Sequence, residues 1–136
     1  MVVVRPAGES DAVAMLALWR EADAEPSRTD DIESVQRLIG HDFGAVIVAE
    51  LDDRMVGSVI AGWDGWRGSI YRLAVAPAYR RRGIGRRLLE AAESRLSGLG
   101  AVRCHAIVVE SDDGANGFWR ASGWEEQKGR RRFVLG

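Results

Sequence analysis

The spacing of apolar and polar residues divides the chain into short strands and amphipathic helices. Apolar, β-branched runs without a helical period predict strands, and these runs lie at residues 2–4, 45–51, 55–61, 69–75 and 102–109. Apolar residues that recur three or four positions apart predict helices at residues 13–22, 30–39, 84–96 and 112–123. Two last short runs, 124–127 and 131–135, predict a hairpin around Lys128-Gly129.

The order of these elements predicts a mixed sheet. The strand at 69–75, the long helix and the strand at 102–109 form a βαβ unit, whose two strands run parallel. The two runs that flank Asp52-Asp53-Arg54 are close enough in sequence to form an antiparallel hairpin. We therefore predict an α/β fold with an α+β type of mixed sheet, in a single domain of residues 1–136.

The segment between the strand at 69–75 and the long helix predicts a phosphate-binding site. Pro77 ends the strand, since proline has no N–H for the ladder. The loop that follows contains Gly83 and Gly85 and opens a helix, whose first N–H groups are unpaired and carry partial positive charge. Glycine has no Cβ to keep an anion away from this backbone. Further positive charge comes from Arg80, Arg81, Arg82, Arg86 and Arg87, so we expect a pyrophosphate site.

Two common glycine loops do not match this segment. A Walker loop ends in G-K-[S/T], and a dinucleotide fingerprint has a third glycine where Leu88 stands. The pattern that remains, R-x-x-G-x-G at Arg80–Gly85, resembles the acetyl-CoA signature of the GNAT N-acetyltransferases. The resemblance continues in the residues on both sides, Leu73-Ala74-Val75-x-Pro77-x-Tyr79 and Leu88-Leu89. The predicted order β-α-α-β-β-β-α-β-α-β-β also matches this family over essentially the whole chain.

The resemblance implies the GNAT acyl-CoA N-acyltransferase fold, with a splayed central sheet and acetyl-CoA between the carboxyl ends of two parallel strands. The backbone of Leu73 and Val75 would then bind the pantetheine arm, and the amide of Val75 would stabilise the oxyanion as an amine attacks. No metal is expected. The cofactor-binding residues implied in this way are Leu73, Ala74, Val75, Arg80, Arg81, Arg82, Gly83, Ile84, Gly85 and Arg86.

A second pattern of the family, N-x-x-A-x-x-[F/L]-Y-x-x-x-G-F, is only partly present. Asp112 and Trp119 replace its asparagine and its tyrosine. In the family this tyrosine is often assigned to protonate the leaving thiolate, and an indole N–H is too weak an acid to do so. A thiol with a pKa near about 8.5 is a tolerable leaving group at neutral pH. Trp119 would then cover the pantetheine and help to pack its own helix. Water or Tyr71 would protonate the leaving thiolate in place of the tyrosine. The positions that match are Ala115, Phe118 and Gly123.

A general base is needed because an alkylamine, with a pKa near about 10.4, is mostly protonated at neutral pH. Glu110 is the best candidate, since it ends the second parallel strand where the cleft should open. The alternative is that Glu110 is a solvated carboxylate or a helix-capping partner. Asp64 is a second candidate, as a base or as an anchor for the acceptor. Trp63 and Trp66 beside it would wall the acceptor pocket or form the contacts of a homodimer.

Composition limits the class of protein. The net charge of −1 argues against a dedicated nucleic-acid-binding protein, which would be basic overall. The single cysteine, Cys104, excludes an internal disulfide and fits a reducing compartment. The chain has neither an apolar run of about 18 residues nor a basic, then apolar N-terminus, so we expect neither a membrane span nor a secretory signal. A cytoplasmic protein is therefore predicted.

We thus expect an N-acetyltransferase that moves the acetyl group of acetyl-CoA to a primary amine of a small molecule or a peptide. A non-catalytic acyl-CoA-binding regulatory module and an RNA-binding surface on the arginine clusters are the alternatives. In the family, the acceptor groove is usually walled by the final hairpin and by the segment that joins the first two helices. Here this helix-joining segment, Asp23 to Asp31, carries Asp23, Glu25, Asp30 and Asp31 against Arg28 alone. A surface of one charge sign concentrates ligands of the other sign, so we expect a cationic acceptor. The competing explanation is that these acids cap the second helix, since Asp30 and Glu33 also resemble a capping box.

Overall fold

The computed structural model describes residues 1–136, in two compact units, Met1–Ala106 and Ile107–Gly136. Unit 1 contains five strands, β1 (Val3–Pro6), β2 (Val46–Leu51), β3 (Arg54–Trp63), β4 (Gly68–Val75) and β5 (Cys104–Ala106). Its α-helices are α1 (Ala12–Glu21), α2 (Ile32–His41) and α3 (Ile84–Leu99). Two short 3-10 helices, η1 (Glu9–Asp11) and η2 (Pro77–Tyr79), precede α1 and the glycine loop. Unit 2 contains α4 (Asp113–Ala121).

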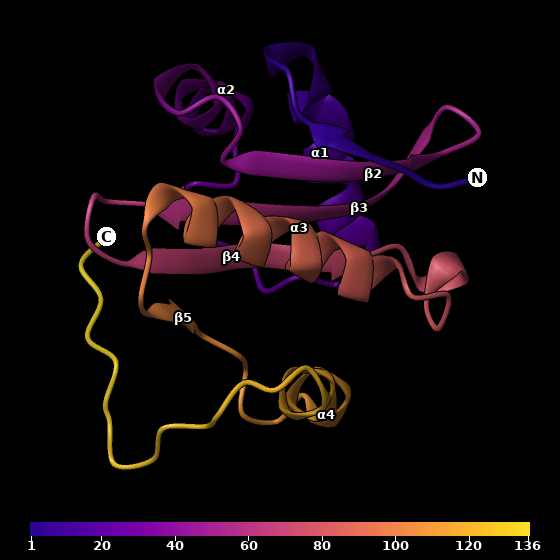
Figure 1. The fold of residues 1–136 in the computed structure, drawn as a ribbon. Coiled ribbons are helices and arrows are strands. Elements are labelled where there is room, and N and C mark those ends of the chain that lie inside the picture. The colour runs from indigo at the N-terminus through magenta and orange to yellow at the C-terminus, as the bar shows by residue number, and fades with distance from the viewer. The chain divides into compact units, whose positions relative to one another are not determined.

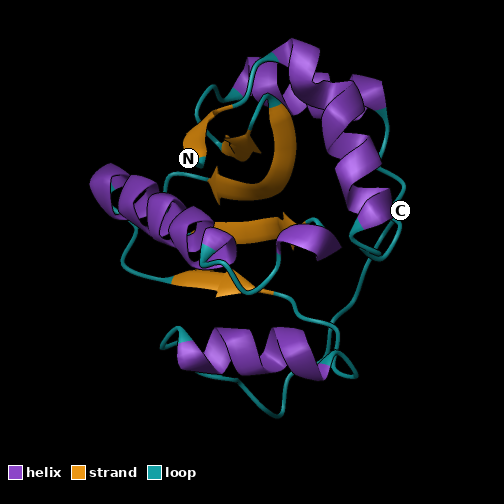
Figure 2. Ribbon diagram, turned by 90° about the vertical axis from the view of Figure 1, so that its right-hand side faces the viewer, coloured by secondary structure: helices purple, strands orange, loops and turns teal.

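The strands of unit 1 form one sheet in the order β1-β2-β3-β4-β5. The pairs β1–β2, β2–β3 and β3–β4 are antiparallel, and β4 and β5 are parallel. Helix α3 covers one face of this sheet, while α1 and α2 lie on the other face (Figures 1 and 2). The predicted mixed sheet with a parallel βαβ unit is therefore confirmed.

The core of unit 1 follows the predicted apolar periodicity. In α3 the side chains of Leu88, Leu89 and Leu96 are fully buried, as their spacing on one helix face requires. Gly57 of β3 lets this helix come close, because a Cβ there would lie 2.7 Å from Cδ1 of Leu88. On the other face of the sheet, a second apolar layer consists of Met15, Leu16, Leu18, Trp19, Val35, Ile39, Val46, Val48 and Ile60.

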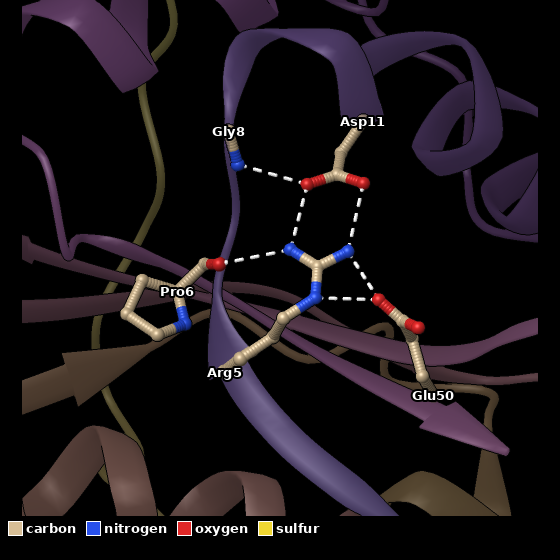
Figure 3. Close-up of polar contacts among 5 residues, drawn as sticks. All are labelled: Arg5, Pro6, Gly8, Asp11 and Glu50. Carbon is tan, nitrogen blue, oxygen red and sulfur yellow. Dashed lines mark hydrogen bonds and ion pairs between the residues drawn. The ribbon is translucent and has the colours of Figure 1, made fainter. Parts of the chain in front are cut away.

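Arg5 of β1 joins three parts of the chain (Figure 3). Its Nη1 and Nη2 donate to Oδ2 and Oδ1 of Asp11 at 2.8 and 3.0 Å, and the guanidinium also pairs with Glu50 of β2. Oδ2 of Asp11 accepts a further hydrogen bond from the Gly8 N–H at 2.8 Å. The hydrogen bonds from Arg5 lower the pKa of Asp11. The side chain of Asp11 therefore does not cap α1, although Asp11 is its N-cap residue.

The predicted capping box at the start of α2 is wrong. The N-cap residue is Asp31, whose Oδ1 accepts from the Ser34 N–H at 2.7 Å. Asp30 lies before the helix, where its carboxylate accepts from the Ser27 N–H at 3.1 Å and binds Arg72 of β4. The ion pair with Arg72 joins residues that are far apart in sequence, and local sequence pattern does not predict such contacts.

The chain after β4 forms fewer strands than predicted. β5 covers only Cys104–Ala106 of the strand expected at 102–109, because only this part pairs with β4. No strand forms at 124–127 or 131–135, so the final hairpin is wrong. The apolar side chains of this segment are exposed, 90% for Phe133 and 102% for Leu135. An isolated hairpin without a buried face is marginal at best.

Unit 2 is organised by α4. Oδ1 of Asp112, its N-cap residue, accepts from the Ala115 N–H at 2.9 Å, as predicted for a cap at this position. Trp119 packs edge-on against Phe118 and Trp124, with ring centroids 6.0 and 4.7 Å apart. In neither unit is any helix both long enough and apolar enough to cross a membrane.

Candidate active site

One edge of β4 is open along the second half of the strand. β5 pairs with β4 only at Gly68, Ser69 and Ile70, so β4 has no strand partner on this edge beyond Ile70. On the other edge, the pairing with β3 shifts register opposite Ser58–Ile60. The irregularity includes Arg72, which has a positive φ of 51° and belongs to a β-bulge. This edge of β4 is therefore unpaired at the residues that were predicted to bind the cofactor.

The backbone of Val75 faces this open edge. The Ala76 N–H donates to the Val56 carbonyl of β3 at 2.8 Å, and successive residues of a strand direct their backbone groups to opposite edges. The N–H and C=O of Val75, which lies opposite Gly57, therefore point away from β3. Leu73, Ala74 and Val75 are all half-buried, so a ligand strand could reach them. An outward N–H at this position is able to donate to an oxyanion.

The glycine loop leads from this edge into the N-terminus of α3. Gly83 is the N-cap residue, in the left-handed region at φ 78°, and a Cβ on it would meet nothing within 4 Å. Arg81, just before it, also has a positive φ, 64°. The first turn of α3 carries no acidic residue. Five arginines of this region are exposed, Arg80, Arg81, Arg82, Arg86 and Arg87. Open glycine backbone, a helix N-terminus and nearby arginines are the features that favour the binding of an anion.

Arg80 has a different set of partners from the other loop arginines. Its Nε donates to the Val75 carbonyl at 3.1 Å and its Nη2 donates to the Ala22 carbonyl at 3.2 Å. The guanidinium of Arg82 lies 5.2 Å from the ring centroid of Tyr79, within cation–π range.

Of the predicted cofactor-binding residues, Ile84 is buried and Gly85 half-buried at the start of α3. Unit 1 thus brings together all ten residues of that prediction.

Two residues at the bulge between β3 and β4 were not predicted from the sequence. Ser58 is the only polar side chain in the core, and its Oγ donates to the Arg72 carbonyl at 2.8 Å. Arg72 itself binds Asp30 and lies over the ring of Trp19, 5.2 Å from its centroid. For Ser58, the sequence does contain a signal, because a serine within the apolar run 55–61 of a buried strand needs a hydrogen-bond partner.

The two remaining predicted catalytic residues belong to unit 2. Glu110 is exposed, and its backbone carbonyl accepts from Nδ2 of Asn116 at 3.1 Å. Its side chain makes no hydrogen bond or ion pair within the unit, so its carboxylate is available to accept a proton. Trp119 is half-buried between two aromatic rings, with no phenol or other acid in its place. Unit 2 thus contains one exposed carboxylate without a side-chain partner and one tryptophan packed against two aromatic rings.

Other candidates have structural partners. Oδ1 of Asp64 accepts from the N–H groups of Trp66 and Arg67 at 2.8 and 2.7 Å, and these hydrogen bonds, the one from Arg67 first, lower the pKa of Asp64. A carboxylate with a lowered pKa is a poorer base. Burial raises the pKa of the Cys104 thiol, which disfavours the thiolate. No cluster of residues suited to a metal ion is present.

A cavity of about 330 Å³ lies elsewhere in unit 1, between β1, β2 and α3. Its wall is mostly apolar, and the two arginines that line it, Arg5 and Arg95, are already paired with Asp11, Glu50 and Asp42. It therefore offers no uncommitted charged group for chemistry. The open edge of β4 and the N-terminus of α3 remain the best candidate site.

Known proteins resemble this chain in sequence and in fold. Residues 13–124 match the acetyltransferase (GNAT) family. An acetyltransferase from Pectobacterium atrosepticum is 34% identical over 117 residues, which cover 86% of this chain and 83% of that protein. The PaiA N-acetyltransferase of Thermoplasma acidophilum in complex with coenzyme A superposes with a TM-score of 0.77 at 17% identity, covering 89% of this chain and 87% of that one. An aminoglycoside acetyltransferase from an uncultured soil sample, in complex with sisomicin, superposes with a TM-score of 0.76 at 23% identity. The superposition covers 99% of this chain and 97% of that one.

Proposed function

This chain belongs to the GNAT family of acetyltransferases, and we propose that it transfers the acetyl group of acetyl-CoA to a primary amine by direct attack in a ternary complex. The acceptor is a small molecule or a peptide amine. The observation that carries this proposal is the open edge of β4, which leads through the glycine loop into the N-terminus of α3. We further propose that residues 1–136 act as one catalytic domain, to which unit 2 supplies Glu110 and Trp119.

The residues of unit 1 fit the donor along its length. The loop from Arg80 to Arg86 would hold the pyrophosphate by backbone N–H groups and arginine charge, with the room beside Gly83 left for the phosphates. The strand residues Leu73, Ala74 and Val75 would bind the pantetheine arm as a neighbouring strand does. When bound, acetyl-CoA supplies an activated thioester. The Val75 N–H would donate to its carbonyl oxygen as negative charge develops there.

The proton transfers fall to groups of unit 2 and to water. Glu110 would take the proton from the acceptor ammonium or from the attacking amine, since its carboxylate is exposed and without a side-chain partner. Trp119 would cover the pantetheine, and it has no acidic proton to give. The leaving thiolate would take its proton from water, which a thiol with a pKa near about 8.5 tolerates at neutral pH.

The acceptor that we propose is cationic. Asp30 and Asp31 are engaged by Arg72 and by the start of α2, so they add little free charge. Asp23 and Glu25 are exposed and make no ion pair, which leaves two free carboxylates on the segment 22–31. A surface of one charge sign concentrates ligands of the other sign. The fold relative bound to sisomicin is an aminoglycoside acetyltransferase, which is consistent with a polyamine-like acceptor.

A non-catalytic acyl-CoA-binding module is the alternative, because Trp119 stands where the family has a tyrosine. The purified protein is incubated with acetyl-CoA and a panel of polyamines, aminoglycosides and peptides. Free thiol and the mass of the acetylated amine are then measured. We expect thiol release that depends on the amine and matches the acetylated product. Tight CoA binding without turnover of any amine would instead support the binding module.

A further inference from the structure

Two arginines of the open edge hold the ends of one segment. The segment is residues 22–31, which joins α1 to α2. Arg80 donates to the Ala22 carbonyl at its first residue, and Arg72 pairs with Asp30 near its end. Arg80 also donates to the carbonyl of Val75, the last residue of β4. Arg72 lies on the bulge of the same strand. The segment is thereby fastened at both ends to the strand that faces the predicted thioester.

The contact at Arg72 is the stronger of the two. Its Nη2 lies 2.8 and 2.7 Å from Oδ1 and Oδ2 of Asp30, and the two side chains are only 18% and 20% exposed. A pair that is largely shielded from water is screened less than a surface pair. The guanidinium also lies over the ring of Trp19. Asp30 in turn accepts from the Ser27 N–H, so the pair also orders the middle of the segment.

The backbone of Arg72 is held as firmly as its side chain. The Arg72 carbonyl accepts from Oγ of Ser58 at 2.8 Å, and that oxygen accepts from Nε1 of Trp19 at 2.9 Å. A positive φ is strained for a residue other than glycine and persists only where its surroundings fix it. The bulge of β4 and the ion pair that holds Asp30 therefore depend on one residue.

We propose that Arg72 and Arg80 are positioning residues, which hold the acidic segment 22–31 beside the carboxyl end of β4 and so set the affinity for the amine acceptor. This inference rests on the proposed function. Between the two fastened ends, the free carboxylates are those of Asp23 and Glu25. A carboxylate on a tethered segment attracts an ammonium group at a defined place, whereas one on a loose segment loses part of this attraction to conformational entropy.

The main test breaks the pair from each side and measures motion directly. The variants are Arg72→Gln, Asp30→Asn and the double variant, with Arg37→Gln as the matched control. Arg37 pairs with Glu33 on α2, where both side chains are mostly exposed, 68% and 85%. We expect faster hydrogen exchange in the amides of residues 22–31 for the three test variants and no change for the control. The double variant should resemble the single ones, because the pair is already broken in each. Unchanged exchange in Asp30→Asn would overturn the proposal even if Arg72→Gln failed to fold.

The acceptor role is then measured with the best amine of the turnover panel. In Asp30→Asn, KM for this amine should rise by at least about fivefold, the lower end of usual coupling between two sites. KM for acetyl-CoA should stay within about twofold, because no group that binds it has been changed. An unchanged KM for the amine, or an equal rise in both constants, would overturn the inference. Absence of turnover with every amine would overturn the proposed function and this acceptor role with it, whereas the exchange experiment would still report on the fastening.

Discussion

The indole Nε1 of Trp19 donates a hydrogen bond to Oγ of Ser58 at 2.9 Å in the core of unit 1. The same oxygen donates to the carbonyl of Arg72 at 2.8 Å. One buried hydroxyl therefore satisfies a tryptophan of α1 and the irregular backbone of β4 together. It links the helix that precedes the acidic segment to the strand that faces the candidate cofactor site.

Replacing Ser58 by alanine should lower the free energy of unfolding by about 2 kcal/mol or more, because a buried donor and a buried acceptor both lose their partner. Chemical denaturation with urea measures the change. Ser94→Ala, at an exposed position of α3, is the control and should change stability by less than about 0.5 kcal/mol. Equal stability of the two variants would show that Ser58 does not hold this junction.

The ion pair of Arg5 and Asp11 predicts a pH dependence of stability. Folding lowers the pKa of Asp11. The charged carboxylate therefore stabilises the protein at pH values above its ordinary pKa of about 4. This contribution is lost as the pH falls through the lower pKa of the folded state. Asp11→Asn should therefore cost about 1–2 kcal/mol at pH 7. The difference from the parent protein should shrink below about pH 4. A difference that stays constant down to pH 2 would contradict this account.

Most elements of unit 1 could be predicted because their signals are local. The period of the apolar residues in α3 identifies its buried face, and Pro77 and Gly83 mark the loop that precedes it. The contacts of Arg72 with Asp30 could not be predicted, since they join residues 42 positions apart. Without them, Asp30 looked like a helix cap. The terminal hairpin was wrong because alternation predicts a strand only where one face is buried, and Phe133 and Leu135 are exposed.

Trp119 should not limit the reaction by lacking an acidic proton. We expect Trp119→Tyr to raise kcat by less than about tenfold, because water suffices to protonate a thiolate, whereas a needed general acid is worth ~10²-fold or more. A tyrosine also keeps an aromatic ring between Phe118 and Trp124. Steady-state kinetics with acetyl-CoA and the best amine measures this. A gain of tenfold or more would mean that the missing acid limits the natural protein.

The charge of the acidic segment should act on the acceptor alone. Changing Asp23 to Asn and Glu25 to Gln together should raise KM for a cationic amine about three- to tenfold, the effect of two exposed charge contacts. KM for acetyl-CoA should not change. The pair Asp52→Asn and Asp53→Asn removes the same charge from the β2–β3 turn and is the control, which should leave both constants unchanged. A panel whose best substrates were neutral or anionic amines would defeat this prediction.

The N-terminus of α3 is proposed to bind the pyrophosphate of acetyl-CoA, and two glycines of that helix allow a matched test. Gly83 and Gly100 lie at its two ends, both have positive φ, 78° and 104°, and at neither would a Cβ meet another atom within 4 Å. Valine should therefore strain the backbone similarly at both positions, by about 1–2 kcal/mol. Only at Gly83 would it also stand in the place of the phosphates.

Titration calorimetry of CoA into the two variants is thus the most direct measurement. We predict that Gly83→Val loses CoA affinity by at least about tenfold, while Gly100→Val, with a similar loss of stability, binds as the parent protein does. Parent-like affinity in Gly83→Val, or an equal loss in both variants, would contradict the assignment of this helix terminus as the cofactor site.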